Sequence, residues 1–360
     1  MTRVRTAVLF AALFAASMLP MLPPSHAAES AAPSGPAAAL RVHTLANGTV
    51  QATVAERIGG RLLAFGLAGR PSFLRFDAGA GAAEPRVDAF GENIGYLGHE
   101  VWVGPQKQWW VHQRLNPRRA ADGAVWPPDP WLGLSNTIVV EDSPAAVALR
   151  GPASPVSGVS LDKRYSLVAG RPNSLRLDVR ATNRRDTRVA WDIWFNTRAH
   201  ADTAVYVPVA ARADVRVEAA ETDRPAPRFA LEDGLFALDL PAPGAADAAR
   251  KGKIFLQPAA GWMAGFRAGQ ALVIQFPHQP RSAIHPDQGQ VELYHDVVPG
   301  RPDEGILEME VHAPYRRLAP REAMQAHELW TILPYDGPAS RAGHLAFLRA
   351  HARALGLCGL

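Results

Sequence analysis

Residues 189–198 of the chain read VAWDIWFNTR and alternate between two kinds of side chain. Because successive side chains of a strand point to opposite faces, Trp191, Ile193 and Phe195 would face a core. The other face then carries four groups that hydrogen-bond or stack: Asp192, Trp194, Asn196 and Arg198. Carboxylate, amide and guanidinium groups bind hydroxyls, and an aromatic ring packs against C–H surfaces. This row has the chemistry that a sugar ligand requires.

Two later segments, VELYHDVV and ILEMEVHA, repeat this alternation. Their polar rows are Glu292, Tyr294 and Asp296 in the first, and Glu308, Glu310 and His312 in the second. If the second row is enclosed, its two carboxylates repel each other, which raises the pKa of one toward the values of general acids and bases. Antiparallel sheets commonly wet one face, so each row has a plain alternative as solvated surface. Trp194 and Tyr294 argue against that alternative, because large aromatic side chains rarely cover a purely solvated face.

The sequence predicts no metal site and no cofactor. Glu292 and His295 are three residues apart, a spacing that suits a metal site on a helix but points the two side chains to opposite faces of a strand. A single cysteine excludes a site made of several thiolates. Four signatures for phosphate, dinucleotide, ester and zinc-protease chemistry do not occur in the sequence: G-x-x-x-x-G-K-[ST], G-x-G-x-x-G, G-x-S-x-G and H-E-x-x-H.

Five of the nine tryptophans lie close together in the sequence: Trp102, Trp109, Trp110, Trp126 and Trp131. A single tryptophan more often fills a core than contacts a ligand. Trp109 and Trp110 are adjacent, so in a strand at most one of them points to the core, as Trp102 is expected to do. The segment WPPDPW cannot continue a central strand, because its prolines lack amide donors. It predicts a stiff loop in which Trp126 and Trp131 are candidate ligand contacts.

The first 27 residues have the pattern of a secretory signal peptide. Arg3 and Arg5 precede a mostly apolar run, and small residues stand before a cleavage point at Ala27 or Ala28. Cleavage would lower the formal net charge from +4 to +2 and leave no segment long and apolar enough to span a membrane. We therefore expect a periplasmic or secreted protein. Residues 28–40 (AESAAPSGPAAAL) are expected to form a flexible tether.

The charge pattern argues against a nucleic-acid partner, because arginine is scattered and no block of five or more basic residues occurs. Cys358 is the only cysteine, so a large core must stabilise the fold without internal disulfides. Short runs rich in valine, isoleucine and leucine recur between turn residues. The dipeptide Asn47-Gly48, between the first two runs, is typical of a type I′ hairpin turn.

Only residues 340–355 have the periodicity of a helix. Their apolar stripe consists of Leu345, Leu348, Ala352 and Leu355, and Gly356 is placed to end the helix. Because no rhythm of alternating strands and helices appears elsewhere, a parallel sheet is not expected. The pattern predicts a large antiparallel β protein with a C-terminal helix.

Several segments, taken in order, resemble the galactose mutarotase-like proteins: GGRLLAFGLAGRP, EVWVGPQ, WPPDPW, VELYHD and LEMEVHAPYRRLAPREAMQAHELWTIL. The resemblance is greatest to an uncharacterised bacterial branch of that superfamily. It covers most of residues 41–336 and implies an all-β fold, a β-supersandwich of two large twisted antiparallel sheets. Residues 337–360 would form the helix beside that domain. The concave face of such a sandwich holds a carbohydrate, so the implied partner is a mono- or oligosaccharide.

The resemblance also implies roles for single residues. In the aldose 1-epimerases of this superfamily a glutamate acts as base on the anomeric hydroxyl, and its place resembles that of Glu308. The histidine that protonates the ring oxygen corresponds to Trp194, and a glycine of the L-x-P-G-E element corresponds to Arg321. Ring opening needs an acid as well as a base, so the chain departs from the epimerase pattern. Three histidines could supply the acid, and no spacing selects one: His200, His295 and His312.

Two functions from different classes therefore stay open. The first is a sugar-binding protein without the epimerase acid/base pair, and its expected contacts are Asp192, Trp194, Asn196, Arg198, Tyr294, Glu310, Trp126 and Trp131. The second is an aldose 1-epimerase-like enzyme with Glu308 as general base and His312 or His295 as acid. A structural or protein-binding β domain is the plain third alternative. The missing histidine places binding ahead of catalysis, and the oligomeric state does not follow from the sequence.

Overall fold

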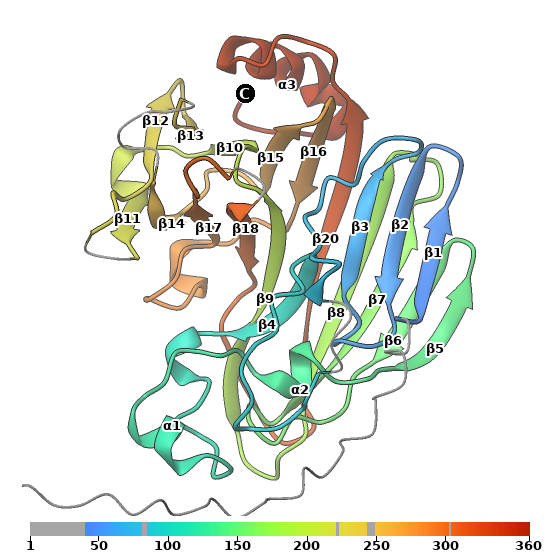
Figure 1. The fold of residues 1–360 in the computed structure, drawn as a ribbon, viewed down its shortest axis with the longest axis vertical. Coiled ribbons are helices and arrows are strands. Elements are labelled where there is room, and N and C mark those ends of the chain that lie inside the picture. The colour runs from blue at the N-terminus through green and yellow to red at the C-terminus, as the bar shows by residue number, and fades with distance from the viewer. Residues whose placement is uncertain (1–39, 81–84, 221–222, 243–248, 302–303) are drawn as a thin grey trace, which may run out of the picture. The chain divides into compact units, whose positions relative to one another are not determined.

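The computed structural model describes residues 40–80, 85–220, 223–242, 249–301 and 304–360. The expected signal peptide and all of the expected tether except Leu40 lie outside these ranges. The described residues form two antiparallel sheets with a helix, α3, near the C-terminus (Figure 1). This arrangement confirms the predicted all-β sandwich with a C-terminal helix. No helix among the described residues is long and apolar enough to cross a membrane.

The first sheet has ten strands among the described residues. Nine follow in the order β1-β2-β3-β4-β9-β18-β17-β14-β11, and β19 pairs with β9. Their bounds are β1 Val42–Ala46, β2 Val50–Ala55, β3 Leu62–Leu67, β4 His99–Gly104, β9 Val189–His200, β18 Ile306–His312, β17 Val291–Asp296, β14 Lys251–Leu256, β11 Val215–Ala219 and β19 Arg316–Leu318.

The second sheet also has ten strands among the described residues, in the order β12-β13-β10-β15-β16-β20-β8-β7-β6-β5. Their bounds are β12 Arg228–Glu232, β13 Leu235–Asp239, β10 Ala204–Pro208, β15 Trp262–Arg267, β16 Gln270–Gln275, β20 Ala323–Pro334, β8 Ser174–Asn183, β7 Val159–Leu167, β6 Ala146–Arg150 and β5 Ile138–Ser143. In Figure 1 this sheet extends from β12 and β13 at the upper left to β5 at the right.

One core lies between the two sheets because each sheet has an apolar inner face. Ile193 and Phe195 of β9 and Met309 of β18 come from the first sheet, while Leu177 of β8 and Trp330 of β20 come from the second. All five side chains are buried. The apolar face expected from the alternation in residues 189–198 is therefore confirmed, and its polar face lies on the opposite side of the first sheet.

The C-terminal helix α3 (Arg341–Leu355) begins and ends where the sequence predicts. The Ser340 side chain accepts a hydrogen bond from the Gly343 amide, and Gly356 ends the helix with a left-handed φ of 69°. The predicted apolar stripe packs against Trp262 and Phe266 of β15, on the outer face of the second sheet.

The first hairpin is confirmed, but its turn differs from the predicted type. Gly48 has a φ of 81° and Asn47 does not have a positive φ, as a type I′ turn would require. Instead the Asn47 side-chain oxygen accepts hydrogen bonds from the amides of Thr49 and Val50. The asparagine acts through its side chain rather than its backbone.

The tryptophan-rich segment contains the 3-10 turn η2 (Gln106–Gln108) and two short helices, α1 (Pro117–Ala121) and α2 (Pro130–Gly133). Trp109 and Trp110 are both buried, so the prediction that at most one of them points to a core is wrong. They follow a helical turn, where successive side chains do not alternate as they do in a strand. The predicted stiff loop holds α2, whose Trp131 amide donates a hydrogen bond to the carboxylate of Asp129.

Candidate functional site

Five neighbouring strands of the first sheet, β4, β9, β18, β17 and β14, carry polar side chains on the face opposite the core. Their register aligns these side chains in rows across the strands. One row, from β4 to β14, consists of Glu100, Asn196, Glu310, Glu292 and Phe255. The next, from β9 to β14, consists of Arg198, Glu308, Tyr294 and Lys253. The polar residues expected from three separate segments thus lie side by side.

This polar face is buried rather than solvated. Asp192, Asn196, Glu310 and His312 each have a relative exposure of 0%. Chain segments around Gln106 and 284–290 lie over the face, because residues from both line a pocket on it. Buried ionisable groups need partners of opposite charge or hydrogen bonds, and the site is built from such pairs.

Lys253 of β14 stands at the centre of the site. Its Nζ lies 2.6 Å from an Oε2 of Glu292 and 2.8 Å from an Oε2 of Glu310. Burial alone would lower the pKa of this lysine, but the two carboxylates raise it above its usual value. The Lys253 side chain keeps 20% of its surface exposed, so a charged ammonium is both held by the protein and within reach of a ligand.

His312 lies between two other acids. Its Nδ1 is 3.3 Å from Asp192 and its Nε2 is 3.4 Å from Glu292. Burial would lower the pKa of the imidazole, yet the negative charges of Glu292 and Asp192 raise it to about 9. The pKa of Glu292 is lowered to about 2 against the effect of burial, because Lys253 and His312 favour its charged form. His312 therefore carries a positive charge at neutral pH.

Glu308 and Glu310 share one face of β18 and have opposite pKa shifts. Burial, followed by the charges of Glu308 and Glu292, raises the pKa of Glu310 to about 8. The pKa of Glu308 is lowered despite burial, because Arg198 lies beside it with Nε 2.8 Å from Oε1. The raised pKa of the pair belongs to Glu310, and burial is its largest cause, to which the charge of Glu308 adds the repulsion expected from the sequence.

Arg198 continues the ion-pair network toward β4. It pairs with Glu100 as well as Glu308, and Glu100 also pairs with Arg61. The guanidinium of Arg198 stands 4.8 Å from the ring centroid of Trp102, a cation–π distance. These contacts fix the Glu308 carboxylate in one place.

Trp194 has neither ring face free for a sugar. Trp109 stacks on the ring at a centroid distance of 5.7 Å, and Lys253 Nζ lies 4.6 Å from the ring centroid. The indole Nε1 donates to Glu310 at 3.1 Å. Trp194 therefore supports Lys253 and Glu310, and it does not offer the stacking surface that its position in the row suggested.

Gly104, the glycine of the WVGP segment, stands where the chain has no room for a side chain. Its amide donates to Asp192 at 3.0 Å, and a Cβ at this position would lie 2.4 Å from the Gln288 amide nitrogen and 2.7 Å from Asp192. A residue with a side chain would displace the aspartate that holds His312. The glycine thus permits the close approach that places Asp192.

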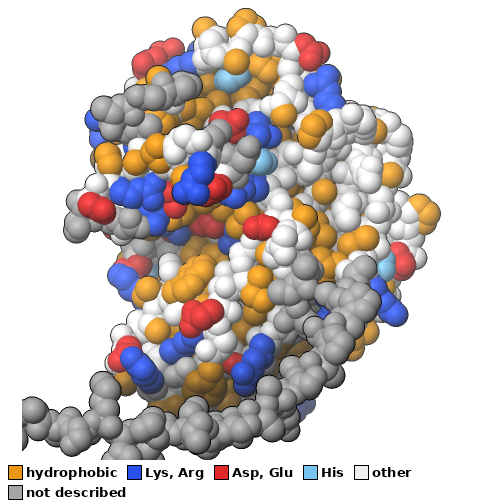
Figure 2. Space-filling view, viewed as in Figure 1, with side chains coloured by type: hydrophobic (Ala, Val, Ile, Leu, Met, Phe, Trp, Pro, Cys, Tyr) orange, Lys and Arg blue, Asp and Glu red, His pale blue; other side chains and the backbone are white. Residues whose placement is uncertain are grey.

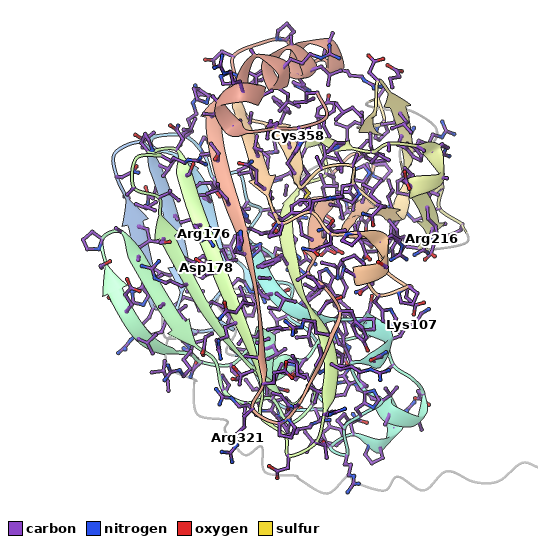
Figure 3. All side chains as sticks on the ribbon, turned by 180° about the vertical axis from the view of Figure 1, so that it is seen from behind. Lys107, Arg176, Asp178, Arg216, Arg321 and Cys358 are labelled. Carbon is purple, nitrogen blue, oxygen red and sulfur yellow. The ribbon has the colours of Figure 1, made fainter. Side chains whose placement is uncertain are left out.

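A pocket of about 340 Å³ opens over this face. Lys253, Glu292, Trp194 and Phe255 lie at its base, and its rim carries Gln106, Lys107, Val125, Arg216, Asp287 and Gln288. Lys107 and Arg216, which come from distant segments, lie on the same side of the molecule (Figure 3). Figure 2 shows acidic and basic side chains around a hollow on the side where β11, β14 and β17 lie. The volume is at the small end of the range for ligand sites, about 300–1,000 Å³.

Other expected site residues lie elsewhere. His295 faces the opposite side of β17, is buried, and bonds to the Ala201 carbonyl at 2.9 Å, and burial lowers its pKa. The structure therefore separates His295 from Glu308. Trp131 is partly buried against the core. Trp126 is 48% exposed and meets Trp102 edge to face at 6.3 Å, next to the polar face. The pairing of β17 places Tyr294 directly opposite Glu308.

Lys253, Phe255 and Gln288 were not predicted as site residues from the sequence. The segment KGKIFL carries Lys251, Lys253 and Phe255 at alternate positions, so a strand reading would have put them on one face. Nothing in the sequence, however, indicates that β14 pairs with β17. Gln288 lies in an irregular segment, where no periodicity applies.

Glu292, Glu310 and His312 offer ligand atoms within 4.8 Å of one another, as a metal site requires. They do not fit one here. The Lys253 ammonium already lies between the two carboxylates, and Asp192 and Glu292 lie beside the two ring nitrogens of His312, so a cation would have to displace Lys253. The prediction of no metal and no cofactor stays a prediction.

Solved structures of other proteins are similar to this fold. A candidate aldose 1-epimerase from Klebsiella pneumoniae subsp. pneumoniae MGH 78578 is similar over 85% of this chain and 81% of its own, with 14% identity and a TM-score of 0.54. The Slr1438 protein from Synechocystis sp. PCC 6803 is similar over 84% and 98%, with 14% identity and a TM-score of 0.51. At these identities the likeness shows the fold, which is the galactose mutarotase-like sandwich that the resemblance implied.

The sequence matches no curated protein. A family model described as "Domain of unknown function (DUF4380)" matches residues 40–333. That range contains all the strands of both sheets except the last residue of β20, and every residue of the polar face. The chain belongs to the DUF4380 family.

Proposed function

We propose that this protein binds a mono- or oligosaccharide on the polar face of β4, β9, β18, β17 and β14, and that it does so without opening the sugar ring. One observation carries the proposal. Lys253, a charged donor held by two buried carboxylates, lies at the base of a pocket together with the ring of Phe255. A fixed donor, adjacent acceptors and an aromatic wall are what sugar hydroxyls and C–H surfaces bind.

The ion pairs support binding because they hold the polar groups in place before a ligand arrives. Lys253, Glu292 and His312 restrain one another, so little side-chain entropy is lost on binding. Phe255 is the ring best placed to contact a sugar, although Arg216 stands 3.6 Å from its centroid and must move aside or bind with it.

Binding is favoured over epimerisation by the state of the two candidate residues. The Glu308 carboxylate is ion-paired with Arg198, and Glu308 does not line the pocket over Lys253. His312 is charged, as an acid must be, but its exposure is 0% and Asp192 and Glu292 hold it on both sides. A general acid needs to approach the ring oxygen to about 3 Å, which this enclosed position does not offer.

The test is titration of the purified protein with a panel of aldoses, uronic acids and short oligosaccharides, followed by calorimetry and saturation-transfer NMR. We expect at least one saccharide to bind, and Phe255→Ala to weaken it about tenfold, or ~1.4 kcal/mol. Arg353→Ala, on α3, is the matched control and should bind normally. A panel with no response would contradict the proposal.

Exchange spectroscopy on the saccharide that binds separates binding from catalysis. The anomers should exchange at the rate measured in buffer. Faster exchange that is lost in Glu308→Gln would contradict the binding-only proposal and support an epimerase.

We also propose that the protein is exported to the periplasm or secreted, on the basis of residues 1–27. Fractionation of the native cells tests this proposal.

A further inference from the structure

The second sheet contains a stretch of strand edge that lies open inside the molecule rather than at its border. β16 pairs with β20 only from Gln270↔Pro334 to Gln275↔Leu329. Beyond Leu329, residues 323–328 of β20 pair with β8 on one side alone. A free edge in the middle of a sheet is unusual, because unpaired strand edges attract other strands.

The register shows which backbone groups this edge exposes. The Asn183 amide donates to the carbonyl of Glu322, just before β20, and the Ile332 amide donates to the carbonyl of Asn173, just before β8, so the even-numbered residues of β20 face β8. Gln325 and His327 therefore direct their N–H and C=O groups to the open side. No other described residue donates to or accepts from these backbone groups.

A pocket of about 800 Å³ lies along this edge and is lined by Gln325, Ala326 and His327. The apolar side chains of Phe195, Val311 and Phe276 also line it. Ala326 is small and faces inward opposite Val179, which leaves room beside the edge. Figure 3 shows β20 running past Arg176 and Asp178, with the other sheet beyond it.

The outward side of the same pocket carries charges that are almost balanced. Three arginines have an acidic partner: Arg150 with Asp162 at 3.6 Å, Arg164 with Glu141 at 2.8 Å, and Arg176 with Asp178 at 2.7 Å. Arg180 lies directly opposite Gln325 and has no ion-pair or hydrogen-bond partner among the described residues. One cation therefore remains available beside the free edge.

We propose that the open edge of β20 binds an extended acidic peptide segment of a partner protein as an added strand. Its backbone would bond to Gln325 and His327 at the spacing of neighbouring strands, ~4.8 Å. Side chains opposite Gln325 and His327 would point outward and those between them inward. The segment should therefore alternate acidic residues, within reach of Arg180, with apolar residues that fill the recess near Phe195 and Val311.

A peptide fits this edge better than an acidic glycan. Both could pair with Arg180, but only a peptide has alternating N–H and C=O groups that match those of a strand. The edge is on the second sheet and shares no lining residue with the pocket over Lys253. This proposal therefore does not depend on sugar binding.

The experiment measures fluorescence anisotropy of a labelled hexapeptide, Val-Glu-Val-Glu-Val-Glu, with the full-length protein. We expect saturable binding that weakens with salt. His327→Pro removes the outward amide, which the fold does not use, and should weaken binding at least tenfold. His327→Ala keeps the amide and should bind within about twofold of the native protein.

Charge and backbone are then tested separately. Arg180→Ala should weaken binding about fivefold, while Arg353→Ala, with the same change in net charge, should not. A hexapeptide with N-methyl groups on alternate amides should lose binding to the native protein, which keeps the test valid if His327→Pro does not fold. The proposal is overturned if the lysine counterpart Val-Lys-Val-Lys-Val-Lys binds as tightly, if N-methylation has no effect, or if only oligogalacturonate binds.

Discussion

The outer faces of the two sheets carry similar rows of charged residues, but these residues are buried on the first sheet and exposed on the second. On the first sheet, Lys253, Glu292 and His312 are buried and form ion pairs that displace their pKa values. On the second, Arg164 and Glu141 form a pair in which both side chains are about two-fifths exposed, at 44% and 39%. The alternation of polar and apolar residues is the same in both. Only burial turns such a row into a fixed, charged site.

The largest expected difference between the faces concerns an unpaired buried charge. Lys253→Met leaves Glu292 and Glu310 without their ammonium partner, so the free energy of unfolding should fall by about 3–5 kcal/mol. Urea denaturation followed by intrinsic fluorescence measures it. A loss below about 1 kcal/mol would mean that the first face behaves as a solvated surface.

Part of the pH dependence of stability should come from the first face, and buried Lys163 and Glu328 of the second sheet, with pKa values shifted to about 7 and about 8, also contribute. The folded pKa of His312 is raised to about 9, so its contribution is fully present below the unfolded value of about 6.5 and is lost as pH rises through 9. Glu310, with its pKa raised to about 8, acts in the same direction. Stability should therefore fall by roughly 3 kcal/mol for His312 between pH 6.5 and 9.5.

Denaturation midpoints across this pH range test that expectation. His312→Asn should remove the share of the slope that comes from His312, because asparagine carries no charge to lose. His327→Asn, on the second sheet, is the matched control and should leave the slope in place. A slope that is equal in both variants would show that the two faces do not differ in this respect.

Substitution of an exposed apolar side chain at each sheet should give a smaller difference, in this case in saccharide binding. Trp126 is 48% exposed beside the polar face, and Ile138 of β5 is 67% exposed at the edge of the second sheet. If Trp126 contacts the sugar, Trp126→Ala should weaken saccharide binding three- to tenfold, about 0.7–1.4 kcal/mol. Ile138→Ala should not change it, and calorimetric titration compares the two.

The smallest effect is expected for the exposed ion pair of the second face. Arg164→Met removes the partner of Glu141, but water already solvates both groups. The midpoint of urea denaturation should change little, and the change should shrink further in high salt. An effect as large as that of Lys253→Met would remove the distinction between the faces.

Most of the fold was predictable from local patterns. The apolar face of residues 189–198, the helix with its Gly356 end and the hairpin at Asn47-Gly48 each depend on neighbours a few residues away in the sequence. Trp109 and Trp110 were misassigned for the same reason. A strand was assumed where the chain makes a turn, and three residues of 3-10 helix are too short for a periodicity to reveal.

The sequence by itself determined which residues share a face, because the two-residue period of a strand is a property of the backbone. Only the tertiary structure decided which faces are covered, that Lys253 meets Glu292 and Glu310, and that β20 is left with a free edge. Those facts depend on which strands become neighbours. Strand pairing joins segments far apart in the chain, and the residues of a single strand do not specify the partner it will have.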